Sequence, residues 1–424
     1  MVKRKKQEIV PLFLGLTHIG QVFSKGWSKK VGKCGVFDFN NKFLNKFKKN
    51  QFTDEEFFLK NERNNTNIDY LEKLEEIIKY KVIFFTYDTP LDEKNGYPRT
   101  LEIEHYLNKL FSIKFTDLTY VFVTSQVYPG FMDKIKKKII NTKIRIIYMV
   151  DTLKMGSALQ SFLKPEQLIF GSCEDNKKII KKTFSKFKAK IFIFNFKEAE
   201  LIKISINLYL FFSVSYANIL EKMARENGIE FSKIINVLKN DKRIGNHAYI
   251  NPSLGMSGGH LERDSFFFNK LNKDLVSSKI VAGMLKFNKN RKNLLSQIIK
   301  KITNNNSIRI LIVGISYKKN SFSLTNTIFS KIFKNKKFNV HIFDDQFKKK
   351  VIKNIVFIKN LKNINKYDII IYNYANIINT KIINKYMKKN LVKKLINISS
   401  EKKYYFKGAN IINIFVKAKN PSII

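Results

Sequence analysis

The sequence predicts an α/β protein in which two doubly wound parallel-sheet domains are joined by a central helical domain. Three observations support this fold class. Apolar β-rich runs alternate with amphipathic stretches through about the first 190 residues, the middle of the chain has a helical pattern, and a second alternation follows. We place the domain limits at 1–197, 198–295 and 296–424.

The expected strands are short runs of β-branched and aromatic residues, which suit a buried pleated surface. In the first domain they lie at residues 9–14, 33–37, 82–86, 120–124, 144–149 and 191–194. In the third domain they are I-R-I-L-I-V-G-I-S, N-V-H-I-F-D-D, Y-D-I-I-I-Y-N and K-K-L-I-N-I-S. A long helix is expected to open at K-E-A-E-L-I-K-I-S-I-N, and the polar segment K-F-N-K-N-R-K-N-L-L is expected to link the helical region to the third domain.

The chain is strongly basic, with 79 Lys and Arg residues against 34 Asp and Glu residues. Such a balance is typical of proteins that bind nucleic acid or an anionic surface. Here the lysines are spread from end to end, and no basic stripe alternates with aromatic residues. We therefore interpret the charge as a solvated surface that also favours an anionic nucleotide ligand, and we do not expect nucleic acid as the main partner.

Cysteine and histidine usage indicates a reducing compartment and no metal site. Cys34 and Cys173 lie far apart, which does not make a disulfide framework and fits the cytoplasm. The histidines at 105, 247 and 341 have no partners at metal-ligand spacing. The first apolar run breaks at Gly15, unlike a signal peptide, and the run L-Y-L-F-F-S-V-S-Y-A-N-I-L is too short to span a membrane.

A dinucleotide-binding motif follows the first expected strand. The residues expected to line it are Gly15, Thr17, His18, Ile19 and Gly20, in which the two glycines and Thr17 hold the positions of G-x-G-x-x-G. Glycines there allow a tight turn and close approach of phosphates to a helix N-terminus, so this half is Rossmann-like. Asp38 ends the next strand, where a carboxylate can hold ribose hydroxyls and favours NAD over NADP. Thr17 is expected to crowd the pyrophosphate, and an ordinary strand–turn–helix is the alternative interpretation.

Polar residues follow two further strands of this sheet. The segments V-I-F-F-T-Y-D-T-P and V-F-V-T-S-Q-V-Y-P-G-F each end a strand and then turn at proline. Ligands of open parallel sheets bind beyond the carboxyl ends of the strands. We therefore expect Thr89, Ser125 and Gln126 to line the cofactor site.

Two later segments carry candidate catalytic groups. Lys203 and Asn207 are four residues apart on the expected long helix and so share one face, where an ammonium and an amide could stabilise a developing alkoxide. A solvated helix face is the alternative. The stretch N-P-S-L-G-M-S-G-G-H-L-E-R-D, residues 251–264, is dense in glycine and is predicted to be a functional loop.

In this order, these segments resemble the nucleotide-sugar dehydrogenases, the UDP-glucose/GDP-mannose dehydrogenase family. The family loop reads roughly N-P-x-x-G-x-G-G-x-C-x-P-K-D, and here His260 stands at the cysteine position, Arg263 at the lysine position and Asp264 at the aspartate. A register shifted by one places Leu261 opposite the cysteine, so neither register supplies a thiol. The other family segments are V-x-T-P, S-T-V-P-P-G, P-E-F-L-R-E-G-x-A with Asp151 at the glutamate, E-x-x-K-x-x-x-N, and G-x-A-F-K-x-N-T-D-D.

The resemblance implies NAD-dependent oxidation of a nucleotide sugar for polysaccharide precursors, by a homodimer associating through its central domain. The catalytic residues it implies are Lys203, Asn207, His260, Asp264 and Asp151. The substrate-binding residues it implies are Tyr249, Asn251, Ser253, Gly255, Gly258, Arg263 and Lys318. In the family the cysteine forms the covalent adduct needed for a second oxidation, a role that imidazole fills poorly. A two-electron dehydrogenase or epimerase, and a non-catalytic nucleotide-binding paralogue, are the alternatives.

Overall fold

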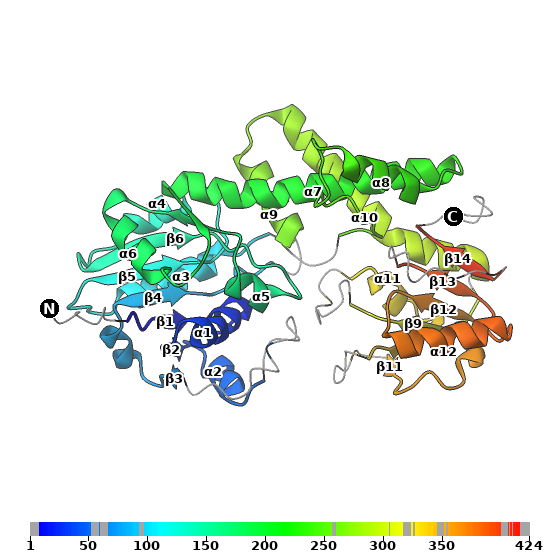
Figure 1. Ribbon diagram of the computed structural model, residues 1–424, viewed down its shortest axis with the longest axis horizontal. Helices are drawn as coiled ribbons and strands as arrows, with labels where there is room; N and C mark the ends of the chain where they lie inside the picture. The colour runs from blue at the N-terminus through cyan, green and yellow to red at the C-terminus, as the bar shows by residue number, and fades with distance from the viewer. Residues whose placement is uncertain are drawn as a thin grey trace. The chain divides into compact units, whose positions relative to one another are not determined.

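A computed structural model describes most of the chain (Figure 1). The described residues are 8–51, 59, 67–92, 97–256, 260–304, 306–316, 324, 327–345, 352, 355–399, 406, 408 and 410–415. The chain divides into two compact units, Met1–Ile206 and Asn207–Ile424. None of the helices in these ranges is both long and apolar enough to cross a bilayer.

The first unit is built on an eight-stranded sheet of order β3-β2-β1-β4-β5-β6-β7-β8. The strands are β1 (Leu12–Leu14), β2 (Cys34–Phe37), β3 (Ile68–Tyr70), β4 (Val82–Phe85), β5 (Thr119–Val123), β6 (Ile144–Met149), β7 (Gln167–Gly171) and β8 (Lys190–Phe194). All neighbours are parallel except β6 and β7. The order reverses between β1 and β4, and this is the topological switch point at which ligands of such sheets bind.

Helices cover both faces of this sheet because successive strand residues point to opposite sides. The helices are α1 (His18–Lys30), α2 (Asn41–Lys48), α3 (Thr100–Phe111), α4 (Phe131–Lys136), α5 (Ala158–Leu163), α6 (Lys177–Thr183) and the start of α7 (Phe196–Glu226). Leu14 packs in the apolar core shared with α3 and α4, whereas Phe13 packs in the core shared with α1 and α5. Helices α1 and α5 lie so close that a Cβ on Gly26 would come 2.2 Å from the Phe162 ring (Figure 1).

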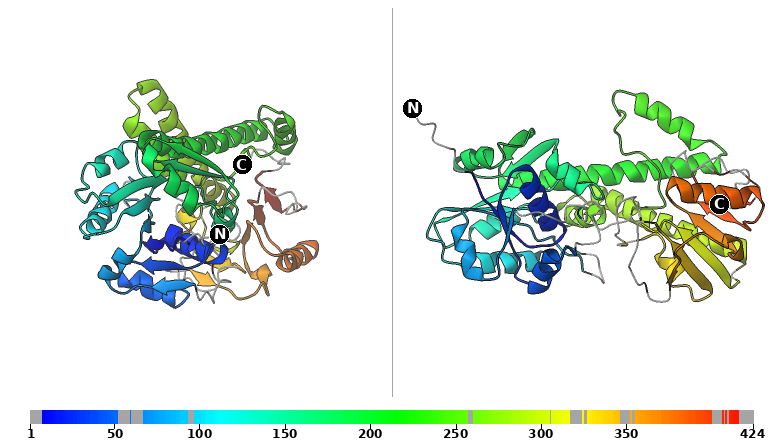
Figure 2. Two further views of the ribbon diagram at one scale, coloured as in Figure 1. Left: turned by 60° about the vertical axis from the view of Figure 1, so that its left-hand side comes forward. Right: turned by 60° about the horizontal axis from the view of Figure 1, so that its bottom comes forward.

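The second unit combines helices with a six-stranded, fully parallel sheet of order β11-β10-β9-β12-β13-β14. The strands are β9 (Ile308–Val313), β10 (Phe338–Phe343), β11 (Val356–Phe357), β12 (Ile369–Tyr372), β13 (Leu395–Asn397) and β14 (Ile411–Asn413). The helices are the rest of α7, α8 (Phe231–Asn240), α9 (His260–Leu271), α10 (Leu275–Thr303), α11 (Ser330–Phe333) and α12 (Ile377–Lys388). Helices α10 and α11 pack on one face of the sheet and α12 on the other (Figure 2).

The predicted fold class is confirmed, and each strand predicted in the first and third regions is present. Four short strands were not predicted: β3, β7, β11 and β14. Strand β3 has only three residues, with Asp69 exposed at its centre, so it lacks the apolar run that marks the others. Strands β11 and β14 have only two and three residues, whereas β7 is a five-residue run with four buried positions that the strand prediction omitted.

Two local predictions were wrong. Residues 251–264 are not one loop, because α9 begins at His260 and includes Asp264. The segment 286–295 is not a linker, because it lies inside α10, which runs without interruption from Leu275 to Thr303. Of its polar residues, Lys286, Lys289 and Asn290 are exposed on the helix, whereas Asn288 and Arg291 are buried with hydrogen-bond partners. The domain limit set at 295 therefore falls within a continuous helix.

Candidate functional site

The glycine turn after β1 has the backbone that phosphate binding needs. Gly15 has φ +103°, and a Cβ there would lie 2.7 Å from the Tyr87 ring; a Cβ on Gly20 would lie 1.8 Å from the Gly15 carbonyl oxygen. Side chains are thus excluded at both positions. Thr17 is the N-cap of α1, and its hydroxyl donates to Thr86 O at 2.8 Å and accepts from Asp88 N at 3.0 Å. The side chain at the middle motif position is therefore held by the turn after β4, and His18 and Ile19 are buried in the first turn of α1.

Asp38 lies directly after β2, as expected, and is fully buried. One carboxylate oxygen accepts from Leu16 N at 2.6 Å, and the other accepts from Asn40 N at 2.8 Å and from the Tyr87 hydroxyl at 3.1 Å. Burial raises the pKa of Asp38, and the three hydrogen bonds oppose that rise. The carboxylate thus ties together the ends of β1, β2 and β4. The Tyr87 hydroxyl lies against this carboxylate and also accepts from Phe39 N at 3.0 Å.

Four predicted residues of the first unit form a chain of hydrogen bonds. The Thr89 hydroxyl donates to Gln126 O at 2.6 Å, and the Gln126 amide lies 3.5 Å from an Asp151 carboxylate oxygen. Lys203 Nζ donates to the Asp151 carbonyl oxygen at 2.5 Å. All four side chains are buried. The structure therefore brings together residues that follow β4, β5 and β6 with the lysine of α7.

Glu200 is a further buried residue in this region. It is fully buried and accepts hydrogen bonds from Gly130 N at 2.6 Å and Met132 N at 2.7 Å. Burial raises the pKa of Glu200 to about 7. Its carboxylate fixes the turn after β5 to α7, one helical turn before Lys203. Glu200 is the glutamate of the E-x-x-K-x-x-x-N segment, from which only Lys203 and Asn207 were predicted as site residues. Ser125 is likewise held inside, because its hydroxyl donates to Tyr87 O at 2.6 Å.

In the second unit, Asn207 and Asp264 meet although 57 residues separate them. Asn207 Nδ2 donates to Asp264 Oδ2 at 2.5 Å, and Arg263 Nε lies 3.4 Å from Asp264 Oδ1. All three side chains are at least 90 % buried. His260 is the first residue of α9, one turn before Asp264, and only its backbone is described.

The loop before α9 is clamped by α7 and α10. Ser253 N donates to Asn218 Oδ1 at 2.7 Å, and Arg291 Nε donates to Ser253 O at 3.0 Å. Met256 N donates to Asn288 Oδ1 at 2.8 Å. Gly255, with φ +105°, leaves no room for a Cβ, which would lie 2.7 Å from Lys292 Cγ. The N-P-S-L-G-M segment is thus a fixed loop, and Asn288 and Arg291 were missed as its supports because their segment was interpreted as a linker.

Arg291 also belongs to a buried ion-pair network. Its guanidinium pairs with Glu221, whose other oxygen lies 3.2 Å from Arg225 Nε. Arg291 is 4 % exposed and Glu221 1 % exposed. Burial lowers the pKa of Arg291, and the Glu221 carboxylate opposes that effect. The network links the C-terminal end of α7 to α10, and Arg291 connects it to the loop through Ser253 O.

Of the remaining predicted substrate-binding residues, two are exposed and two lie outside the described part of the chain. Tyr249 is 54 % exposed, and Asn251 is exposed and accepts from Lys239 Nζ at 3.2 Å. Gly258 and Lys318 lie outside the described residues. Within the described ranges, no three His, Cys, Asp or Glu side chains are placed to hold a metal ion.

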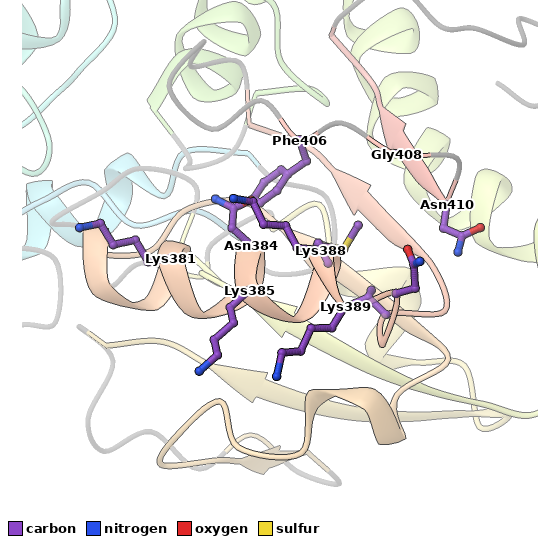
Figure 3. Close-up of a pocket in the computed structure, with 11 residues that line it drawn as sticks. Lys381, Asn384, Lys385, Lys388, Lys389, Phe406, Gly408 and Asn410 are labelled. Carbon is purple, nitrogen blue, oxygen red and sulfur yellow. The ribbon is translucent and has the colours of Figure 1, made fainter.

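A cavity of about 970 Å³ lies in the second unit beside α12 (Figure 3). Its lining includes Lys381, Lys385 and Lys388 of α12, Lys389 directly after the helix, and Phe406. The lysine side chains point in different directions rather than toward one centre (Figure 3). None of the predicted site residues lines it.

Two parallel-sheet units, with a glycine turn at the switch point of the first, are typical of nucleotide-binding α/β proteins. Residues 197–290 match the central domain of the UDP-glucose/GDP-mannose dehydrogenase family. The chain is 28 % identical to a UDP-glucose 6-dehydrogenase of Campylobacter jejuni over 66 % of this chain and 70 % of that protein. It is 26 % identical to a UDP-N-acetyl-D-mannosamine dehydrogenase of Methanocaldococcus jannaschii over 51 % of this chain and 50 % of that protein, so it spans about half the length of that relative.

The fold is that of a solved UDP-glucose dehydrogenase from Pyrobaculum islandicum, with a TM-score of 0.83 over 98 % of this chain and all of that chain, at 17 % identity. The family match in the central segment, the sequence relatives and the shared fold together support similarity to the UDP-glucose/GDP-mannose dehydrogenase family.

Proposed function

We propose that the chain oxidises a CH–OH group of a nucleotide sugar in the cytoplasm, for polysaccharide precursor synthesis. The observation that supports this most directly is the pairing of predicted catalytic positions. Lys203 contacts Asp151 and Asn207 contacts Asp264, although each pair joins sequence segments more than 50 residues apart. Buried polar groups are costly unless they are satisfied, so such pairs are typical of built sites rather than solvated helix faces.

The proposed chemistry follows from these groups. The Lys203 ammonium and the Asn207 amide would stabilise the negative charge that develops on the substrate oxygen. His260, one helical turn before Asp264, would accept the hydroxyl proton as general base. Bound NAD, the cofactor that the family uses, would accept the hydride. The fixed loop at 251–256 would position the nucleotide sugar.

The absence of a thiol predicts that oxidation stops after one step. The second oxidation in the family depends on a covalent thiol adduct, which His260 and Leu261 cannot form. We expect one NADH per sugar consumed and an aldehyde as the product; an epimerase would instead return the hydride to the sugar and leave no net NADH. Counting NADH by absorbance and identifying the product by mass spectrometry would test this.

Two NADH per sugar with release of a uronic acid would contradict the single-oxidation prediction. The variants His260→Cys and Leu261→Cys provide matched controls for the two loop registers, since only a thiol in the correct register should enable the second step. Absence of NADH with every nucleotide sugar would favour the second candidate, a non-catalytic nucleotide-binding paralogue. That candidate is supported by the contact of Tyr87 with Asp38.

We also propose a homodimer formed through α7. Tyr209, Tyr216 and Met223 recur at seven-residue intervals and are 65 %, 46 % and 56 % exposed. Residues at this spacing line one helix face, and an exposed apolar face is typical of an interface. Tyr216→Glu with Met223→Glu should convert the dimer to a monomer in light scattering, whereas Lys222→Glu, on the same helix, should leave it dimeric. A wild-type protein that is monomeric at micromolar concentration would refute the proposal.

A further inference from the structure

Tyr87 reaches across three strand ends at the switch point of the first sheet. It comes two residues after β4, and its ring lies against Gly15, at the end of β1. Its hydroxyl donates to Asp38, at the end of β2, and accepts from Phe39 N at 3.0 Å. The side chain therefore spans the crevice in which a sheet of this topology binds its ligand.

Aromatic packing holds the Tyr87 ring in this position. The Tyr106 ring of α3 stacks on it with centroids 4.4 Å apart and planes within 7°, and the Phe39 ring lies 5.8 Å from Tyr106 at 6°. Lys109 Nζ lies 5.8 Å from the Tyr106 ring centre. Tyr87 is 4 % exposed, so its ring is enclosed between the stack and the glycine turn.

The position of Tyr87 limits access to the Asp38 carboxylate. A ribose hydroxyl must come within about 2.7 Å of a carboxylate oxygen to bind it. Both oxygens of Asp38 already accept hydrogen bonds, and its side chain is fully buried. With Tyr87 in place, an adenosine ribose cannot reach the carboxylate that the motif provides for it.

The second unit repeats this arrangement independently. Gly314 follows β9 with φ +82°, and a Cβ there would lie 2.5 Å from the Tyr374 carbonyl oxygen. Asp344 follows β10 and accepts from Ile315 N and from the Tyr374 hydroxyl, both at 2.9 Å. Tyr374 follows β12, the strand across the switch point from β9. A glycine, an aspartate and a tyrosine thus lie together at the corresponding strand ends of both sheets.

We propose that Tyr87 occupies the adenosine-ribose position of the dinucleotide site and competes with NAD for Asp38. NAD binds only when the Tyr87 side chain leaves the carboxylate. A binding-competent state that is fractionally populated lowers the apparent affinity by that fraction, so Tyr87 sets how tightly the cofactor is held. The inference rests on the proposed function only in naming NAD as the ligand.

The test measures NADH binding to the full-length chain by calorimetry. Tyr87→Val, which places at this position the valine of the family V-x-T-P segment, should bind NADH about tenfold or more tightly than the wild type, a gain of about 1.4 kcal/mol or more. Tyr87→Phe keeps the ring but loses the hydroxyl, so its affinity should lie between the two. Tyr374→Val, the matched change in the second unit, should leave NADH affinity within about twofold of the wild type.

Three outcomes would overturn the proposal: equal NADH affinity of wild type and both Tyr87 variants, weaker binding by the variants, or no NADH binding by any of them. Thermal melting shows that each variant is folded, and Tyr87→Phe provides a second reading if Tyr87→Val is unstable. Nucleotide-sugar binding, measured separately by the shift in melting temperature, tests the proposed function. Its failure would leave the NADH result for Tyr87 unaffected.

Discussion

Replacing Lys203 by alanine should lower kcat by about a hundredfold or more, while the protein stays folded and its thermal transition falls by roughly 2–12 °C. Removing one preorganised donor that stabilises a developing oxyanion typically costs 10²–10³ in rate. The structural loss is smaller, because the hydrogen bond from Lys203 Nζ to Asp151 O contributes about 1–3 kcal/mol. In a unit of this size, 1 kcal/mol shifts Tm by roughly 2–4 °C.

The control for this experiment is Lys222→Ala, which removes an exposed lysine from the same helix. It should change neither kcat nor Tm. Steady-state rates with a nucleotide sugar and NAD, together with calorimetric melting, give both quantities for each variant. If Lys203→Ala unfolds the protein but the residual folded fraction keeps full specific activity, Lys203 is structural rather than catalytic.

Strands were predicted correctly where burial on both faces gives an uninterrupted run of apolar residues. Strands such as β4 and β9 are covered on both faces, so they appear as apolar runs, and their order follows from the βαβ connection. Of the strands that were missed, β3, β11 and β14 have only two or three residues, whereas β7 is a buried run, Q-L-I-F-G, that the strand prediction omitted. The polar centre of α10 was misinterpreted because Asn288 and Arg291 look solvated in the sequence, although the fold buries both with partners.

Site prediction depended on resemblance more than on spacing. Lys203 and Asp151 lie 52 residues apart, and spacing alone could not predict their contact. Tyr87 lies inside a segment that was singled out for Thr89, yet nothing local shows whether an aromatic residue after a strand faces the core or the crevice. Only the fold decides that, because the partner of Tyr87, Asp38, is 49 residues away.

The buried ion pair between α7 and α10 should dominate the stability of the second unit. Arg291 and Glu221 are both almost fully buried, and burial lowers the pKa of Arg291, which shows the desolvation cost of its charge. Removing one partner of such a pair leaves the other charge buried without its counter-charge and costs about 3–5 kcal/mol. Arg291→Met should therefore lower the free energy of unfolding in urea by about that amount.

A double-mutant cycle separates this charge effect from simple loss of packing. Arg291→Met combined with Glu221→Leu removes both charges, and similar apolar replacements of buried pairs are often neutral, so the double variant should recover most of the loss. Arg243→Met, which removes an exposed ion pair with Asp241, should have no measurable effect. Because Arg291 also holds Ser253 O, Arg291→Met should weaken nucleotide-sugar binding even below its melting temperature. A loss below about 1 kcal/mol would show that Arg225 alone satisfies Glu221 and that the loop does not depend on Arg291.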